Sequence, residues 1–170
     1  MFANLEKGGC EAAVLTMPSF FVAEEKGFRT LADPAEMDIY YLQNSVDTTR
    51  SYLKANRAQA IRFAKGLIEG VAYFKNTRRE SRSVTKKLRI QSAQEKDIKY
   101  LEASYNLLAT KYYNPTLYAT PKAVETSLEF IAATEPKARG ADVKQFVDES
   151  IVKEVEASGF IKHLYETEYR

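Results

Sequence analysis

The chain has 170 residues, and its 25 Lys and Arg against 23 Asp and Glu give a formal net charge of +2. This length suffices for one domain with a sizeable core, or for one domain and part of another. The nearly balanced charge argues against nucleic acid or an anionic membrane as an obligatory partner. One cysteine, Cys10, excludes an intrachain disulfide, and one histidine, His163, leaves little material for a metal or catalytic site. We predict no cofactor and no metal.

The N-terminal residues do not have the pattern of an export signal. They lack a basic segment followed by an uninterrupted apolar one, and Glu6 and Lys7 lie where a lipoprotein signal before Cys10 would need apolar residues. No apolar run approaches the ~18–20 residues that span a bilayer. As written, the chain is expected in the cytoplasm, and its location is otherwise undetermined.

The first third of the chain has the pattern of an α/β protein. Short apolar runs at 12–15 and 28–32 are typical of buried strands. Residues 1–7 are expected to be the last turns of a helix that Gly8 and Gly9 stop. A helix between the two runs is predicted to begin at Pro18 and Ser19 and to end at Gly27. The expected local structure is a strand–helix–strand unit.

The remainder is predicted to be helical after an extended segment over 39–53, which is rich in Tyr, Val and Thr. Asn56 is the expected N-cap of the longest helix, which continues to Lys75 with Gly66 and Gly70 as positions of close packing. The apolar positions of this helix are Ala60, Ile61, Ala64, Leu67, Ile68, Val71 and Phe74. Later boundaries are a capping box at Ser92 and Glu95, a break at Asn114 and Pro115, a start at Thr120 and Pro121, and a stop at Gly159. Inward positions of the later helices are Ile98, Leu101, Tyr105, Leu108, Val124, Leu128, Ile131, Val147, Ile151 and Val155.

Four blocks of the sequence resemble, in their order and spacing, segments of one protein family. The blocks are residues 5–18 (LEKGGCEAAVLTMP), 23–33 (AEEKGFRTLAD), 48–70 (TTRSYLKANRAQAIRFAKGLIEG) and 146–161 (FVDESIVKEVEASGFI). They are similar to the solute-binding proteins of ABC importers for nitrate, sulfonates, taurine and thiamine-pyrimidine precursors. Glu11 departs from the family, which commonly has Asp there, and the first half of the family's length has no counterpart in this chain.

The resemblance implies an α/β fold, the helix-rich C-terminal portion of a type II periplasmic binding fold. Short strands at the N-terminal end would be followed by about five helices. Residues 1–45 would form the end of the second lobe, and residues 46–170 the returning helical part of the first lobe.

The resemblance also implies a binding protein and not an enzyme. Intact relatives are periplasmic or extracytoplasmic, hold a small solute between two lobes and present it to an ABC permease. Ligand-binding candidates follow the first predicted strand or lie on the return between lobes: Thr16, Met17, Pro18, Ser19, Asn44, Ser45 and Thr48. Ser19 at a helix start would favour an anion, although residues 16–19 are equally consistent with a simple strand-to-helix turn. Because a sheet without companion strands exposes its edges, we expect a homodimer.

Other interpretations remain open at the level of sequence. The main alternative is a truncated, helix-rich interaction or scaffold protein that has lost ligand binding. A basic stretch over 78–89 is more typical of a solvated helix face than of a nucleic-acid site. The tyrosines of the middle segment could stack on a flat ligand but are more typical of helix–helix seams. Acidic residues around His163 suggest ion pairs, such as Glu149 with Lys153, and not a metal site.

Overall fold

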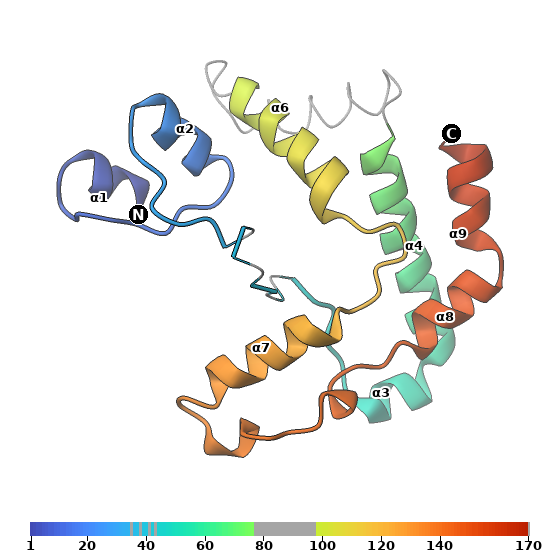
Figure 1. Cartoon of the computed structure of the whole chain (residues 1–170). Coiled ribbons are helices and arrows are strands. Elements are labelled where there is room, and N and C mark those ends of the chain that lie inside the picture. The colour runs from blue at the N-terminus through green and yellow to red at the C-terminus, as the bar shows by residue number, and fades with distance from the viewer. Residues whose placement is uncertain (35, 38, 41, 43, 77–97, 170) are drawn as a thin grey trace. The chain divides into compact units, whose positions relative to one another are not determined.

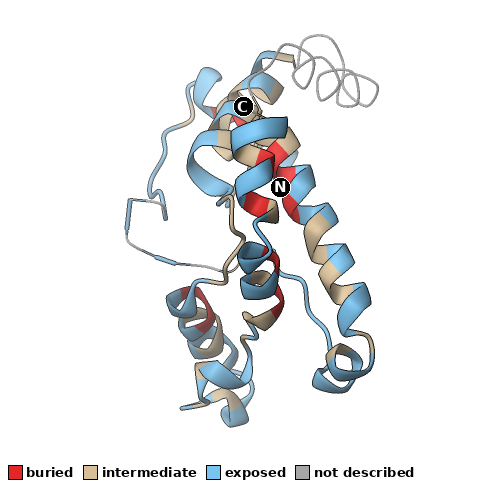
Figure 2. Ribbon diagram, turned by 90° about the vertical axis from the view of Figure 1, so that its right-hand side faces the viewer, coloured by how far each residue is buried: buried red, intermediate tan, exposed pale blue. Residues whose placement is uncertain are grey.

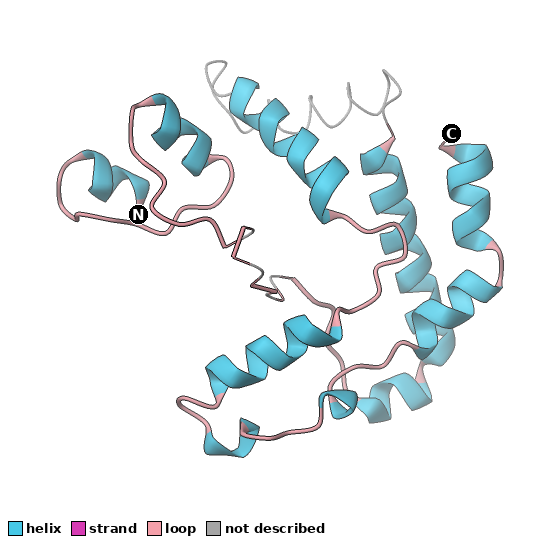
Figure 3. Cartoon of the chain, in the orientation of Figure 1, coloured by secondary structure: helices cyan, strands magenta, loops and turns pink. Residues whose placement is uncertain are grey.

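The computed structural model describes residues 1–34, 36, 37, 39, 40, 42, 44–76 and 98–169, and over these residues the chain is helical. Figure 1 shows the order of the elements, and Figure 3 shows that the described residues form helices and loops with no strand. The chain divides into two compact units. The first comprises Met1–Asp33 and Thr77–Tyr113, and the second comprises Pro34–Asn76 and Asn114–Arg170.

The predicted α/β fold is therefore wrong for the described part of the chain. Residues 12–15 and 28–32 follow irregular paths, and neither segment pairs with another. A strand exists only when its backbone N–H and C=O groups bond to a neighbouring strand. Val14 is 83% exposed and Leu31 is 70% exposed, so these short apolar runs are also not buried as the prediction required.

The segment predicted to be extended over 39–53 differs too. Helix α3 spans Arg50–Ala55, and Thr49 caps it by accepting a hydrogen bond from the backbone N–H of Tyr52 at 3.2 Å. The capping threonine at the helix start outweighs the β-propensity of the Tyr- and Val-containing sequence before it, since a cap satisfies a backbone donor that would otherwise lack a partner.

The first unit contains α1 (Phe2–Glu6), α2 (Ser19–Glu25), α6 (Ile98–Leu107) and the π-helix η2 (Leu108–Tyr112). Two predicted helix ends are confirmed: Gly8 follows α1 at φ 71° and Gly27 follows α2 at φ 84°. Only glycine takes this left-handed conformation without a steric cost. Lys99 of α6 forms an ion pair with Glu25 of α2, and the rings of Phe2 and Phe28 meet edge to face at 6.3 Å.

The second unit contains the longest helix, α4 (Arg57–Lys75), with α3, α7 (Pro121–Ile131), α8 (Ser150–Ala157) and α9 (Phe160–His163). Two 3₁₀ turns, η3 (Pro136–Ala138) and η4 (Val143–Gln145), join α7 to α8, and the π-helix η5 (Leu164–Glu168) follows α9.

The predicted boundaries of the second unit are largely confirmed. Asn56 is the N-cap residue of α4, although its side chain donates to the carbonyl of Tyr52 instead of capping. Thr120 and Pro121 begin α7, and Gly159 separates α8 from α9 at φ 76°. The capping box at Ser92 and Glu95 and the basic stretch over 78–89 lie outside the described residues.

The core of the second unit is formed where α4, α8, α9 and η5 meet (Figure 2). Its buried side chains are Ile68, Ala72, Val155, Ile161 and Leu164. Ile151 and Val155 face inward as predicted, whereas Ile131 at the end of α7 is 49% exposed, contrary to its predicted inward position. Within the described residues, no helix is both long and apolar enough to cross a membrane.

Candidate functional site

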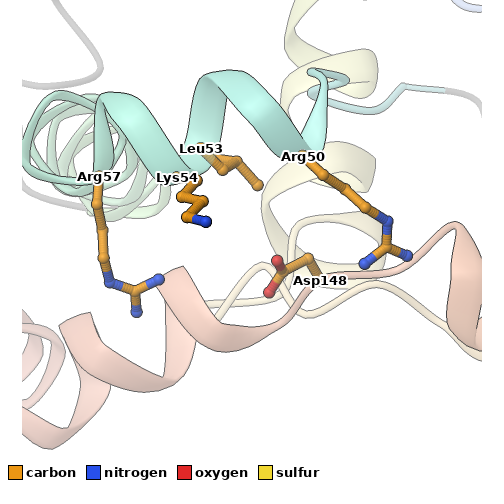
Figure 4. A pocket seen from close by; sticks show the side chains of 5 residues that line it. All are labelled: Arg50, Leu53, Lys54, Arg57 and Asp148. Carbon is orange, nitrogen blue, oxygen red and sulfur yellow. The ribbon is translucent and has the colours of Figure 1, made fainter.

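A groove of about 330 Å³ lies in the second unit, between α3 with the start of α4 and the segment that leads into α8. Figure 4 shows the side chains that line it: Arg50, Leu53, Lys54, Arg57 and Asp148. The three cationic side chains reach from the helix side toward the segment that carries the carboxylate of Asp148. The volume is at the lower end of the ~300–1,000 Å³ range of small-molecule sites.

The cationic side chains come from two consecutive helices. Arg50 and Lys54 are four residues apart in α3, which places them on one side of that helix, and Arg57 is the first residue of α4. Helix α3 ends at Ala55, and α4 begins two residues later, with Asn56 between them at φ −126° and ψ 33°. The local helical structure thus brings three positive charges onto one wall of the groove.

Arg57 is held in place by α8. Its Nη2 and Nε atoms donate to Oε2 of Glu154 at 2.6 and 3.0 Å, and its Nη1 donates to the hydroxyl of Ser150 at 3.2 Å. Such charge-assisted hydrogen bonds fix the direction of a guanidinium group. Glu154 therefore neutralises much of the charge of Arg57 and positions it at one end of the groove.

Arg50 and Lys54 carry the remaining positive charge. Arg50 donates through Nη2 to the backbone carbonyl of Gln145 at 2.7 Å, which orients the guanidinium without neutralising it. Lys54 forms no ion pair within the described ranges, and its side chain lines the groove. These two cations are available to a negatively charged ligand.

Asp148 is the one carboxylate among the lining residues. Its Oδ1 atom accepts a hydrogen bond from the backbone N–H of Ser150 at 2.9 Å, at the start of α8. Hydrogen bonds from the Ser150 hydroxyl and backbone lower the pKa of Asp148, and the charges of Arg57 and Arg50 lower it further. Asp148 is thus ionised near neutral pH and is occupied in part by the start of α8.

The ligand-binding residues predicted from the sequence lie elsewhere. Thr16, Met17, Pro18 and Ser19 belong to the first unit, where Pro18 precedes α2, and Ser19 is its first residue. Helix α2 has only seven residues, and no preceding strand directs this turn toward a ligand.

The remaining predicted ligand-binding residues belong to the second unit. Asn44, Ser45 and Thr48 are exposed in the irregular segment before α3, and none lines the groove. The Ser45 hydroxyl donates to Oδ2 of Asp47 at 2.9 Å, so its one described interaction is local.

Sequence reasoning missed the groove because it treated residues 39–53 as extended. A signal was present, since Arg50, Lys54 and Arg57 have helical spacing within the block 48–70. Recognising Thr49 as a cap would have placed Arg50 and Lys54 on one face of a helix.

Other predicted interactions can be compared with the structure directly. The ion pair between Glu149 and Lys153 is confirmed at 2.9 Å, and among the described residues no group of three or more His, Cys, Asp or Glu is placed to hold a metal. The glycines of α4 do not mediate close packing among the described residues, because a Cβ at Gly66 or Gly70 would meet nothing within 4 Å beyond the local backbone of the helix itself. No family model, curated protein or solved structure matches the chain.

Proposed function

We propose that this chain is a non-catalytic binding protein that holds a small anionic solute, of the sulfonate or carboxylate class, in the groove of the second unit. The observation that carries this proposal is that Arg50, Lys54 and Arg57 all line a groove that only one carboxylate, Asp148, lines. Arg offers a planar fork of donors for an oxyanion, and Lys adds a mobile point charge. Non-covalent capture needs no nucleophile or general base.

The resemblance to solute-binding proteins of ABC importers supports the same class of ligand. The most specific block of that resemblance, residues 48–70, contains all three cations of the groove. The proposal does not use the predicted sheet, since the described residues contain no strand. Residues 16–19 are not part of the proposed site, because the strand that was expected to direct this turn toward a ligand is not present in the described part of the chain. The resemblance also suggests delivery of the solute to a permease, which the binding experiments below do not address.

Isothermal titration calorimetry with propanesulfonate and butyrate tests the proposal, with propanol as a neutral probe of similar size. We expect saturable binding of both anions and none of propanol. Losing one charge-assisted hydrogen bond costs about 1.5–3 kcal/mol, so Arg50→Ala and Lys54→Ala should each weaken binding by about tenfold or more.

Matched controls are Arg139→Ala and Lys137→Ala, which remove the same charges from exposed positions of the second unit outside the groove. These controls should bind like the wild type. Asp148→Asn should tighten binding, because it removes the negative charge from the groove while an amide oxygen can still accept the hydrogen bond of Ser150. Equal losses in the control variants, or binding unaffected by Arg50→Ala and Lys54→Ala, would contradict the proposal.

The second candidate function is that of a helix-rich interaction protein. It is favoured by exposed apolar side chains that share a face of α4, Phe63 at 58% exposure and Leu67 at 42%. Large exposed apolar residues that share one face mark interaction surfaces more often than isolated ones do. Thermal-shift measurements separate the two functions, because a bound anion stabilises the folded chain by mass action and a lost ligand site gives no shift.

A further inference from the structure

Helix α4 has two apolar faces, and only one of them contributes to the core. Ile68, Val71 and Ala72 are buried. On the outer side, Phe63 is 58% exposed and Leu67 is 42% exposed. Helical geometry therefore gives α4 a second, outward-facing apolar stripe, independent of the groove.

The stripe includes positions without side chains. Gly66 and Gly70 lie on the same side of α4 as Phe63 and Leu67, at helical spacing. A Cβ at either glycine would meet nothing within 4 Å beyond the local backbone of α4. Two bulky apolar side chains beside two open glycine positions form a surface of projections and hollows. A second helix can approach such a surface closely.

Charged residues beside the stripe indicate which helix fits. Arg62 and Glu69 are both exposed, lie on the same flank of the stripe and are seven residues apart. When two copies of α4 pack antiparallel about a twofold axis at Gly66, Arg62 of each copy lies opposite Glu69 of the other. In a parallel arrangement the twofold axis runs along the helices and puts the charged flanks of the two copies on opposite sides of the contact, so neither pair forms. The charge pattern is self-complementary in the antiparallel arrangement.

We propose that this face of α4, formed by Phe63, Gly66, Leu67 and Gly70 with Arg62 and Glu69 at its flank, binds the same face of a second copy of the chain. The contact is isologous, so each copy supplies the same surface. Phe63 of one copy lies over the turn of the other that carries Gly70. One helix face is smaller than the ~800 Å² per partner of a standard interface, so the dimer dissociates at micromolar concentrations.

Charge exchange tests the arrangement. Sedimentation velocity of the full chain should show a concentration-dependent dimer that weakens at high salt. Arg62→Glu or Glu69→Arg alone creates repulsion at both of the symmetry-related contacts between positions 62 and 69 and should weaken dimerisation at least tenfold. An equimolar mixture of the two variants should form a heterodimer, because each new charge then faces its opposite. The proposal would be overturned if both single variants dimerised as well as the wild type. It would also be overturned if the wild-type chain stayed monomeric at ~100 µM, 100-fold above ~1 µM.

Cross-linking provides a test that does not depend on charge. In a Cys10→Ser background, Gly66→Cys places a thiol at the twofold axis, where it meets its own copy. We expect disulfide-linked dimers to form much faster than with Lys137→Cys, a control at an exposed position far along the chain. Equal rates for the two variants would contradict the proposed contact between copies. Circular dichroism of each variant verifies that the helices remain.

Discussion

Arg57 and Glu154 join the start of α4 to the middle of α8 across 97 residues of sequence, with Nη2 and Oε2 2.6 Å apart. The same pair lies at one end of the groove, because Arg57 lines the groove and Glu154 holds Arg57 in place. This ion pair therefore links α4 to α8 and fixes Arg57 at the groove.

A double-mutant cycle measures how much this pair stabilises the fold. Both side chains are nearly half exposed, at 46% and 48%, so solvent screens their attraction. We expect Arg57→Ala and Glu154→Ala to show a coupling free energy of about 0.2–1 kcal/mol in urea unfolding at low salt, decreasing at high salt. The pair of Lys162 and Glu166, at 3.9 Å, should show a smaller coupling. A larger value for that control pair would contradict the assignment.

The core of the second unit should be sensitive to the loss of Ile68. This side chain is 1% exposed between α4 and its neighbours, so Ile68→Ala leaves a cavity. We expect the free energy of unfolding to fall by about 2–5 kcal/mol. Ile131→Ala makes the same chemical change at a position that is 49% exposed and should cost less than about 1 kcal/mol. Equal losses would place Ile68 outside the core.

The lowered pKa of Asp148 predicts that the free energy of unfolding decreases in acid. Because its folded-state pKa is lowered, the ionised form stabilises the folded chain above the ordinary aspartate pKa, and this contribution is lost as pH falls through the lowered value. Asp148→Asn removes the contribution. The difference in unfolding free energy between wild type and variant should therefore shrink from neutral pH toward acid. If the difference between wild type and variant instead grew on acidification, the hydrogen bonds with Ser150 would not be the cause of the stabilisation.

The raised pKa of Tyr118 predicts that the free energy of unfolding decreases at alkaline pH. Its hydroxyl donates to Glu156 of α8, and this hydrogen bond raises the pKa of Tyr118 to about 12. The protonated form stabilises the folded chain below the ordinary tyrosine pKa of ~10, and the contribution is lost as pH rises toward 12. Glu156→Gln should lower the pKa of Tyr118, measured by NMR of ring-labelled tyrosine with Tyr118→Phe to assign the signal. An unchanged pKa would exclude Glu156 as the cause.

Helix positions could be predicted from the sequence wherever a local signal sets them. Gly8, Gly27 and Gly159 end helices because they alone accept a left-handed backbone there, and Thr120 with Pro121 begins α7. These signals act over a few residues and need no knowledge of the rest of the fold.

The absence of strands from the described residues could not be predicted in the same way. Residues 12–15 have the apolar composition of a buried strand, but a strand also needs a partner, and composition does not supply one. The groove required a long-range fact as well. The helical spacing of Arg50, Lys54 and Arg57 is local, but the approach of Asp148 from the other side follows from the packing of α8 on α4.

The most direct test of the proposed function is to locate a bound anion by NMR. Titration of the isotope-labelled full chain with propanesulfonate should shift the backbone amides of α3 and of Asp148, together with the side-chain Nε–H of Arg50, all with one saturable dissociation constant. Lys54→Ala should weaken these shifts, whereas Lys137→Ala should not. If the shifts instead gather at residues 16–19 or 44–48, or if none saturates, the groove is not the binding site.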